Sequence, residues 1–205
     1  MPHRRLVPLL AVAAAVLGSA ACAGDQSAAL RVDDETVSST ELFDELELIT
    51  TNDEFRAATI GENVPLSELQ GTLRSSYTQT FAAAILNQRL RYLLADDVLA
   101  DNDLEVTDSD RDDIERQIND LMSEGGADSL PDAYREDLVE GLARLSVLQE
   151  ALGSQEAGTA LRDAAESADI RVSSQFGTWN EDTLSIDPPP GPAGASDDEA
   201  GSGRG

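Results

Sequence analysis

The stretch "ADIRVSSQFGTW", residues 168–179, follows the last predicted helix and contains the only tryptophan in the chain of 205 residues. Ile170, Val172 and Phe176 fall on one face of an extended backbone, with Ser174 between them, which predicts a β-strand over residues 170–176. A single short strand is not stable alone and needs a partner strand. The position of that partner therefore decides how the chain closes.

The partner is expected at the other end of the chain, in "ALRVDDETVSS" at residues 29–39. Leu30 and Val32 alternate as in a strand, and the following pair of aspartates favours a turn. We expect Ile170 and Val172 to pair with this segment, with Gly177 permitting a sharp turn and Trp179 folding back to cap the helical core. An exposed Trp179 that stacks on a ligand is the alternative interpretation.

Between these ends the apolar periodicity is helical. Ser38 and Glu41 have the spacing of a capping box at the start of a short helix with Leu42, Leu46 and Ile49 on one side. Residues 67–100 continue the pattern for longer than an ordinary globular helix, as one long helix or as two helices with a kink.

Three further helices complete the pattern. Thr107 or Asp108 is expected to cap a helix whose buried face contains Ile114, Ile118, Leu121 and Met122. Another helix begins near Pro131, and a smaller alanine-rich helix starts at residue 154. The first of these two carries one apolar side, made of Leu138, Leu142, Leu145, Leu148 and Leu152. The sequence therefore predicts a mainly α fold: a bundle of about five helices, one of them long, with short terminal strands paired in a small sheet.

The composition excludes several functions. Asp and Glu number 40 against 14 for Lys and Arg, a formal net charge of -26, which excludes a protein that binds nucleic-acid backbone. The only histidine, His3, lies in the predicted leader, so histidine catalysis and a zinc site are not expected. No glycine-rich phosphate loop follows a strand. We expect neither cofactor, metal ion nor enzymatic activity.

Two ideas based on carboxylates stay open as alternatives. A pair of acids could hydrolyse glycosides, although the chain has few aromatic residues to stack on sugars. Residues 101–112, "DNDLEVTDSDRD", superficially resemble a calcium-binding EF-hand loop. Val106 stands where that loop needs glycine, and Asp112 stands where it needs glutamate. We therefore interpret the segment as the end of one helix and the capped start of the next.

The beginning and the end of the chain are expected to lie outside the folded domain. "MPHRR" and the apolar stretch that follows it predict a signal peptide over residues 1–21. Cys22, the only cysteine, resembles the lipidated residue of a bacterial lipoprotein, whereas Ser19 and Ala21 would also suit ordinary signal peptidase. Residues 22–28 form a lipidated tether, and the Pro/Gly-rich acidic residues 188–205 form a disordered tail.

Residues 29–187 resemble the N-terminal peptide-binding domain of SurA-like chaperones, in the lipoprotein form of high-GC Gram-positive bacteria. The resemblance rests on the extended start with its capped helix, on "LRYLLADDVLADNDLEVTDSDRDDIERQI", and on the ending. Val172, Phe176, Gly177 and Trp179 match the family's final segment, whereas Ser174 and Gln175 replace its proline and arginine. The parvulin isomerase domain of many family members has no counterpart here, because "LGSQEAGTA" occupies its place.

The resemblance implies an exported chaperone, anchored by lipid to the extracytoplasmic face of the cell membrane, that binds unfolded or newly exported polypeptides without isomerase catalysis. Its acidic surface is expected to favour cationic clients. A structural or adaptor lipoprotein that docks one dedicated envelope partner is the alternative. If Cys22 carries no lipid, the protein is secreted.

Overall fold

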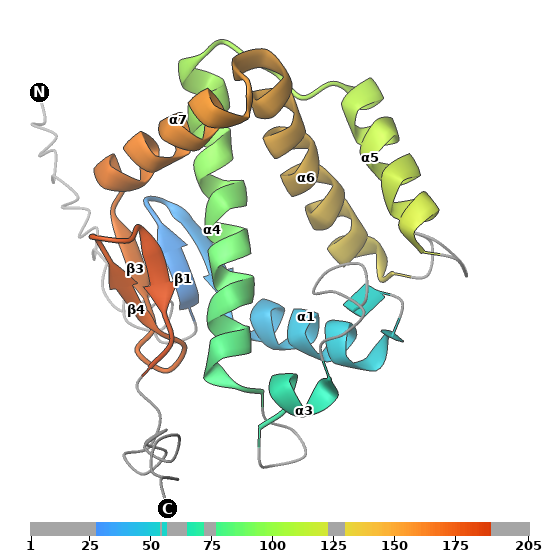
Figure 1. Ribbon diagram of the computed structural model, residues 1–205, viewed down its shortest axis with the longest axis vertical. Helices are drawn as coiled ribbons and strands as arrows, with labels where there is room; N and C mark the ends of the chain where they lie inside the picture. Colours follow the sequence, from blue (N-terminus) through green and yellow to red (C-terminus); the bar gives the residue numbers. More distant parts are fainter. Residues whose placement is uncertain (1–27, 54, 57–64, 72–76, 123–129, 190–205) are drawn as a thin grey trace, which may run out of the picture.

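The computed structural model describes residues 28–53, 55–56, 65–71, 77–122 and 130–189 (Figure 1). Helices dominate the described part, and a small antiparallel sheet lies at one side. The predicted mainly α fold, with its small sheet, is confirmed. The predicted signal peptide, Cys22, the tether up to residue 27 and the tail from residue 190 lie outside the described residues.

The two ends of the domain meet in a three-stranded antiparallel sheet. β1 (Ala28–Val32) lies between β2 (Glu35–Ser38) and β3 (Ile170–Val172). Leu30 pairs with Val172, and Val32 pairs with Ile170, as the sequence predicted. Leu30 and Val32 are both buried, so the inward face of the sheet is part of the hydrophobic core.

The first helix, α1 (Ser39–Thr51), begins at the predicted capping box. The backbone N–H of Glu41 donates to Oγ of Ser38 at 3.1 Å, and the backbone N–H of Ser38 donates to the Glu41 carboxylate at 2.7 Å. Both bonds satisfy amides that the start of a helix would otherwise leave unpaired.

The long periodic segment contains two helices, α3 (Leu66–Leu69) and α4 (Gln79–Asp101), so the two-helix alternative is correct. Thr78 caps the start of α4, where its hydroxyl accepts a hydrogen bond from the N–H of Phe81 at 3.3 Å. Its own N–H donates to the carbonyl of Leu69 at 2.8 Å, which ties the short helix to the start of the long one.

Thr107 caps α5 (Asp108–Leu121), where its hydroxyl accepts from the N–H of Asp110 at 3.3 Å. Residues 101–112 thus contain the end of α4, a turn and a capped helix start, as expected. The predicted buried face is correct for Ile114, Ile118 and Met122 but wrong for Leu121, which is 69% exposed. Leu121 is the last residue of α5.

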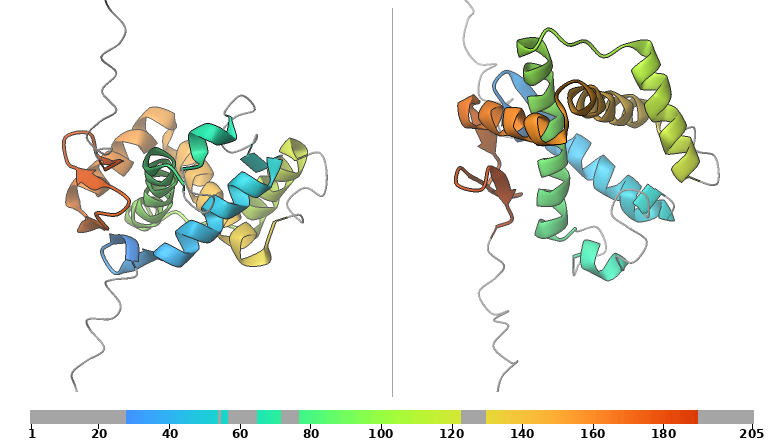
Figure 2. Two further views of the ribbon diagram at one scale, coloured as in Figure 1. Left: turned by 90° about the horizontal axis from the view of Figure 1, so that it is seen from below. Right: turned by 45° about the horizontal axis from the view of Figure 1, so that its top comes forward.

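The chain returns through α6 (Asp132–Leu152) and α7 (Ser154–Ser167). Gly153 joins the two helices with φ 82°, a left-handed conformation that favours glycine. In Figures 1 and 2, α4 and α6 lie side by side, α5 lies on the far side of α6, and the sheet lies on the far side of α4.

The closing segment, residues 170–179, differs from its prediction after Val172. Residues 174–176 form a turn, in which the N–H of Phe176 donates to the carbonyl of Ser173 at 2.9 Å, and not the continuation of the strand. A hairpin that the sequence did not predict follows, made of β4 (Thr178–Asn180) and β5 (Ser185–Asp187). The side chain of Asn87 on α4 bonds both backbone groups of Ile186, at 2.8 and 3.0 Å, and so fixes the hairpin on that helix.

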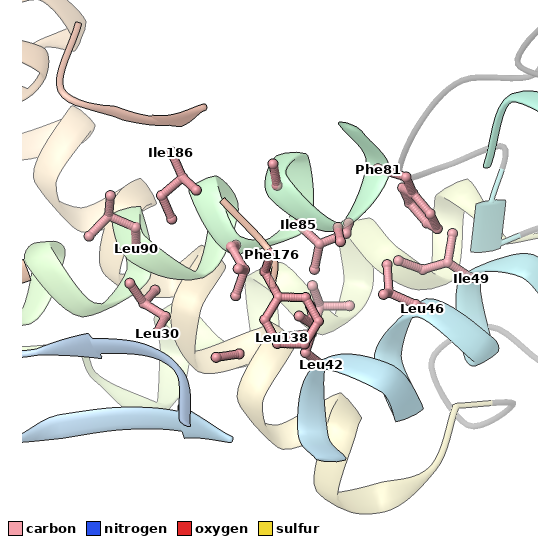
Figure 3. Packing of buried hydrophobic residues seen from close by; sticks show 14 of the residues in the cluster. Leu30, Leu42, Leu46, Ile49, Phe81, Ile85, Leu90, Leu138, Phe176 and Ile186 are labelled. Atoms are coloured by element: carbon pink, nitrogen blue, oxygen red, sulfur yellow. The ribbon is translucent and has the colours of Figure 1, made fainter. Parts of the chain in front are cut away.

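The core lies between α1, α4, α6 and the closing segment (Figure 3). Leu42, Leu46 and Ile49 of α1 are fully buried there. Phe176 is 3% exposed, and its ring meets that of Phe43 edge-on at 5.5 Å between centroids. No helix in the described ranges has the length and apolarity needed to cross a bilayer.

Candidate functional site

A pocket of about 450 Å³, here called the α5 pocket, opens between α5 and α6. None of its described lining residues is charged, although 26% of the chain is charged. Its polar lining consists of Gln88, Gln117, Ser146 and Gln149. Its apolar lining consists of Phe55, Ile114, Ile118, Leu121, Met122, Leu138, Leu142 and Leu145.

Leu121 makes the α5 pocket unusual. Among the described residues it is the most exposed large apolar side chain, and it lies on the lining of this pocket. An exposed leucine is unremarkable by itself, but one that borders an apolar pocket extends the area that a partner could cover.

α5 forms one wall of the α5 pocket. It packs chiefly on α6, through Ile114 and Ile118. Near its start, Arg111 donates from Nε to the Glu140 carboxylate at 2.7 Å, and this hydrogen bond holds the pKa of Glu140 below its ordinary value. At its other end Met122 is buried, whereas Leu121 is exposed on the lining of the pocket.

A second pocket of about 770 Å³, the α7 pocket, lies between α4, α7 and the β4–β5 hairpin. Gln88, Leu145 and Gln149 line both pockets, so the two adjoin across the α4–α6 pair. We call the two together the groove. Leu90, Leu94 and Leu161 continue its apolar lining into the α7 pocket, where Arg91 and Arg162 are the charged lining residues.

Among the described residues, no aspartate or glutamate lines the groove. This is unexpected for a chain that contains 40 acidic residues. Glutamines supply hydrogen-bonding groups without charge, and leucines and isoleucines supply most of the remaining surface. A surface of this kind suits a ligand that is partly apolar and that carries backbone or amide groups.

The structure places the strongest buried charges elsewhere. Glu45 on α1 is 4% exposed and accepts hydrogen bonds from Arg89 at 2.8 Å and from the Tyr134 hydroxyl at 3.0 Å. Burial raises the pKa of the Glu45 carboxyl, and Arg89 opposes that rise. Burial opposes the charge of Arg89, yet Glu45 raises the pKa of Arg89. Burial also raises the pKa of Tyr134, helped by the charge of Glu45.

This buried pair does not have the geometry of a catalytic carboxylate. Glu45 lines neither pocket of the groove, and its carboxylate oxygens are already bonded to Arg89 and Tyr134. Asp137, the nearest second acid, lies 3.6 Å from the Arg89 guanidinium and is exposed. The arrangement connects α1, α4 and α6 and is best explained as structural.

The residues of the closing segment lie at the opposite side of α4 from α5. Ile170 and Val172 are in β3, and Phe176 is in the core. Gly177 approaches β5 so closely that a Cβ there would lie 2.5 Å from Cγ2 of Ile186 and 2.7 Å from the carbonyl oxygen of Asp187. Glycine is needed for this close approach, and its φ is not in the left-handed region.

Trp179 is half-buried in β4. It packs against the edge of the core, and it also borders a small pocket with the acidic residues Glu181, Asp182 and Asp187. Phe176, and not Trp179, is therefore the deepest aromatic residue of the closing segment. Neither residue contributes to the groove.

Calcium binding was the other carboxylate alternative. Within the described residues no group of three or more Asp, Glu, His or Cys side chains is placed to hold a metal ion. In residues 101–112, the side chain of Asp110 bonds to Thr107 as part of the helix cap. These bonds hold the pKa of Asp110 below its ordinary value.

No family model matches the chain, and searches of curated proteins and of solved structures give no match. The candidate site therefore rests on the groove itself. Leu142 and Leu145 were expected in a core stripe and are half-buried on the groove. Arg91 and Arg162 were not predicted as site residues, because neither belongs to a sequence motif and they lie in helices that are far apart in the sequence.

Proposed function

We propose that the protein is an exported, lipid-anchored chaperone that holds unfolded or newly exported polypeptides in the groove, without prolyl isomerase activity. The observation that carries this proposal is the groove without acidic residues, bordered by the exposed Leu121, in a chain of net charge -26. The resemblance to SurA-like chaperones and the expected lipidation of Cys22 support it independently.

The chemistry of the groove fits an extended polypeptide. Apolar contact with leucine and isoleucine is non-directional and accepts many side chains. Glutamine amides both donate and accept, so Gln88, Gln117 and Gln149 could bond the backbone groups that an unfolded chain leaves unpaired. Such contacts give broad and weak selectivity, which suits a protein that must release its clients.

The acidic remainder of the surface serves the same function. A large net charge of one sign keeps a protein soluble and separates its copies. A client bound in the groove would share this negative surface charge. Complexes would then repel one another, which keeps the client from aggregating. The described lining of the groove has no acidic residue and offers apolar contact.

The test is an aggregation assay with the chain from Ala23 to Gly205, which contains every described residue. At near-equimolar amounts it should delay the aggregation of several unfolded clients. Leu121→Gln should weaken the delay, with a loss of affinity of about fivefold, since part of one leucine is no longer covered. Leu66→Gln is the matched control, because Leu66 is 36% exposed and lies outside the groove. Failure to delay any of several clients would remove the chaperone function.

The alternative, an adaptor for one dedicated envelope partner, makes a different prediction. Crosslinking from the groove in cells would then capture one protein at a fixed ratio, and not a range of exported chains. Mass analysis of the exported protein would show a lipid on Cys22 in either case. Cys22→Ala should release the protein from the membrane.

A further inference from the structure

We infer that Arg91 and Arg162 form a carboxylate-binding element at the α7 end of the groove, which selects client segments that carry Asp or Glu beside apolar residues. The inference rests on the proposed function and specifies its substrate. The net charge of the whole chain suggests a preference for cationic clients, whereas these two arginines would favour acidic side chains.

The first observation is that the two arginines line one pocket. Arg91 on α4 and Arg162 on α7 line the same pocket, and these helices pack against each other. Both residues are exposed to solvent. Among the described residues, no carboxylate lines the pocket with them.

The second observation is that other arginines of the described chain have acidic partners. The paired arginines are Arg56 with Asp53, Arg89 with Glu45, Arg111 with Glu140, Arg116 with Asp113, Arg135 with Asp132, Arg144 with Asp96 and Arg171 with Asp169. Within the described residues, neither Arg91 nor Arg162 lies within ion-pair distance of a carboxylate. In a chain with 40 acids and 14 bases, two free cations in one pocket leave an unmatched local positive charge.

The third observation concerns what lies next to that charge. Leu90, Leu94 and Leu161 line the α7 pocket beside the arginines, and Leu145 links it to the α5 pocket. A carboxylate bound by the guanidinium groups would place the neighbouring residues of its chain on this apolar lining. Guanidinium–carboxylate bonds are charge-assisted and often bidentate, so they add direction to otherwise non-directional contact.

We assign the carboxylate to Asp and Glu side chains and not to the C-terminus of the client. An unfolded polypeptide presents many acidic side chains and only one chain end, so a chaperone that meets unfolded chains meets side-chain carboxylates far more often. The acidic remainder of the surface opposes acidic clients over a long range, whereas the arginines act only within the groove. Together they would select short acidic sites within apolar segments and reject chains that are acidic throughout.

The experiment measures fluorescence anisotropy of labelled peptides against the chain from Ala23 to Gly205. Three peptides share one apolar sequence, have an amidated C-terminus, and carry Glu, Gln or Lys at one flank. We expect the Glu peptide to bind about tenfold more tightly than the Gln peptide, and the Lys peptide more weakly than both. Arg91→Gln with Arg162→Gln should remove this preference, so that the Glu and Gln peptides bind the variant with equal affinity.

The control is the double variant Arg116→Gln with Arg171→Gln, which removes the same number of charges outside the groove. It should keep the preference for Glu, and a loss there would overturn the inference, because a long-range field would then explain it. Equal binding of the Glu and Gln peptides to the unaltered protein would also overturn it, while leaving the proposed function in place.

A fourth peptide with a free C-terminus and the Gln flank tests the other source of a carboxylate. If it alone gained affinity, the assignment to side chains would be wrong. Absence of binding by every peptide would overturn the proposed function itself.

Discussion

Glu45 of α1 and Arg89 of α4 form a buried ion pair, with 2.8 Å between Oε2 and Nε. Tyr134 of α6 donates to the second oxygen of the same carboxylate at 3.0 Å, and the Arg89 guanidinium lies 5.5 Å from the centre of its ring. The Glu45 carboxylate thus connects three helices that are distant in the sequence, and both of its oxygens are hydrogen-bonded. A buried ion pair adds little to the free energy of unfolding, but removing one partner lowers that free energy strongly, because the other charge is left buried and unpaired.

Arg89→Met should therefore lower the free energy of unfolding by about 3 kcal/mol, since it leaves the Glu45 carboxylate buried without its cation. Urea denaturation at pH 7 measures the change. The double variant Glu45→Leu with Arg89→Met should lose less than the single variant, because no charge is stranded. Asp113→Asn breaks the exposed Arg116–Asp113 pair and should cost below about 1 kcal/mol. Equal losses for Arg89→Met and Asp113→Asn would contradict the structural role of the buried pair.

Gly141→Ala tests the close crossing of α4 and α6. A Cβ at Gly141 would lie 2.5 Å from Cγ of the buried Tyr92 ring, which cannot move away cheaply. We expect a loss of about 2 kcal/mol in unfolding free energy. Gly158→Ala is the matched control in α7, where a Cβ meets no atom within 4 Å. There alanine should raise the stability by up to about 1 kcal/mol, since glycine is the poorer helix former. A stable Gly141→Ala variant would show that the helices can separate without cost.

The closing segment can be tested by comparing its two aromatic residues. Phe176→Ala removes a ring that is 3% exposed and should cost about 3 kcal/mol or more. Trp179→Ala should cost less, because Trp179 is only half-buried. Thermal unfolding followed by circular dichroism ranks the two variants. A larger loss for Trp179→Ala would make the tryptophan the principal closing residue. Neither variant should alter peptide affinity at temperatures where it remains folded, since neither residue lines the groove.

The pKa of Glu140 gives a prediction about pH. The Arg111 hydrogen bond lowers this pKa from its ordinary value of 4.5, so the folded state favours the charged carboxylate. The stabilisation by Glu140 is fully present above the pKa of the unfolded chain and is lost as the pH falls through the lower folded pKa. Glu140→Gln should therefore be less stable than the unaltered protein at pH 7, by less than about 1 kcal/mol because the site is partly exposed. The difference should disappear in acid. A difference that persisted at pH 2 would exclude the carboxylate charge as its cause.

Local signals in the sequence predicted local structure well. The capping boxes that begin at Ser38 and Thr107 fix helix starts through bonds between residues three positions apart, so no tertiary knowledge is needed. The pairing of β1 with β3 was predicted because two short strands at opposite ends of the domain each needed a partner, and β1 also pairs with β2. The hairpin of β4 and β5 gave no such signal, because each strand has three residues and depends on Asn87 for its position.

Errors in the prediction arose where tertiary contacts decide the outcome. Leu121 continues an apolar stripe, yet it is 69% exposed, whereas Met122 directly after it is 3% exposed. The apolar spacing continues through the break between α3 and α4, so periodicity alone could not separate them. The groove could not be predicted, because its lining comes from helices whose packing determines which faces converge. Arg91 and Arg162 become neighbours only when α4 and α7 cross.

The central strand β1 has its two partners at opposite extremes of the described chain: β2 follows it directly, and β3 arrives only at Ile170. A chain that emerges from its N-terminus onward can form the first hairpin and the helices early, since these contacts are local. The sheet stays incomplete until residues 170–172 are available. Until then the apolar face of β1 lacks part of its cover, so under the proposed function the protein would have to complete its own folding before it could hold a client.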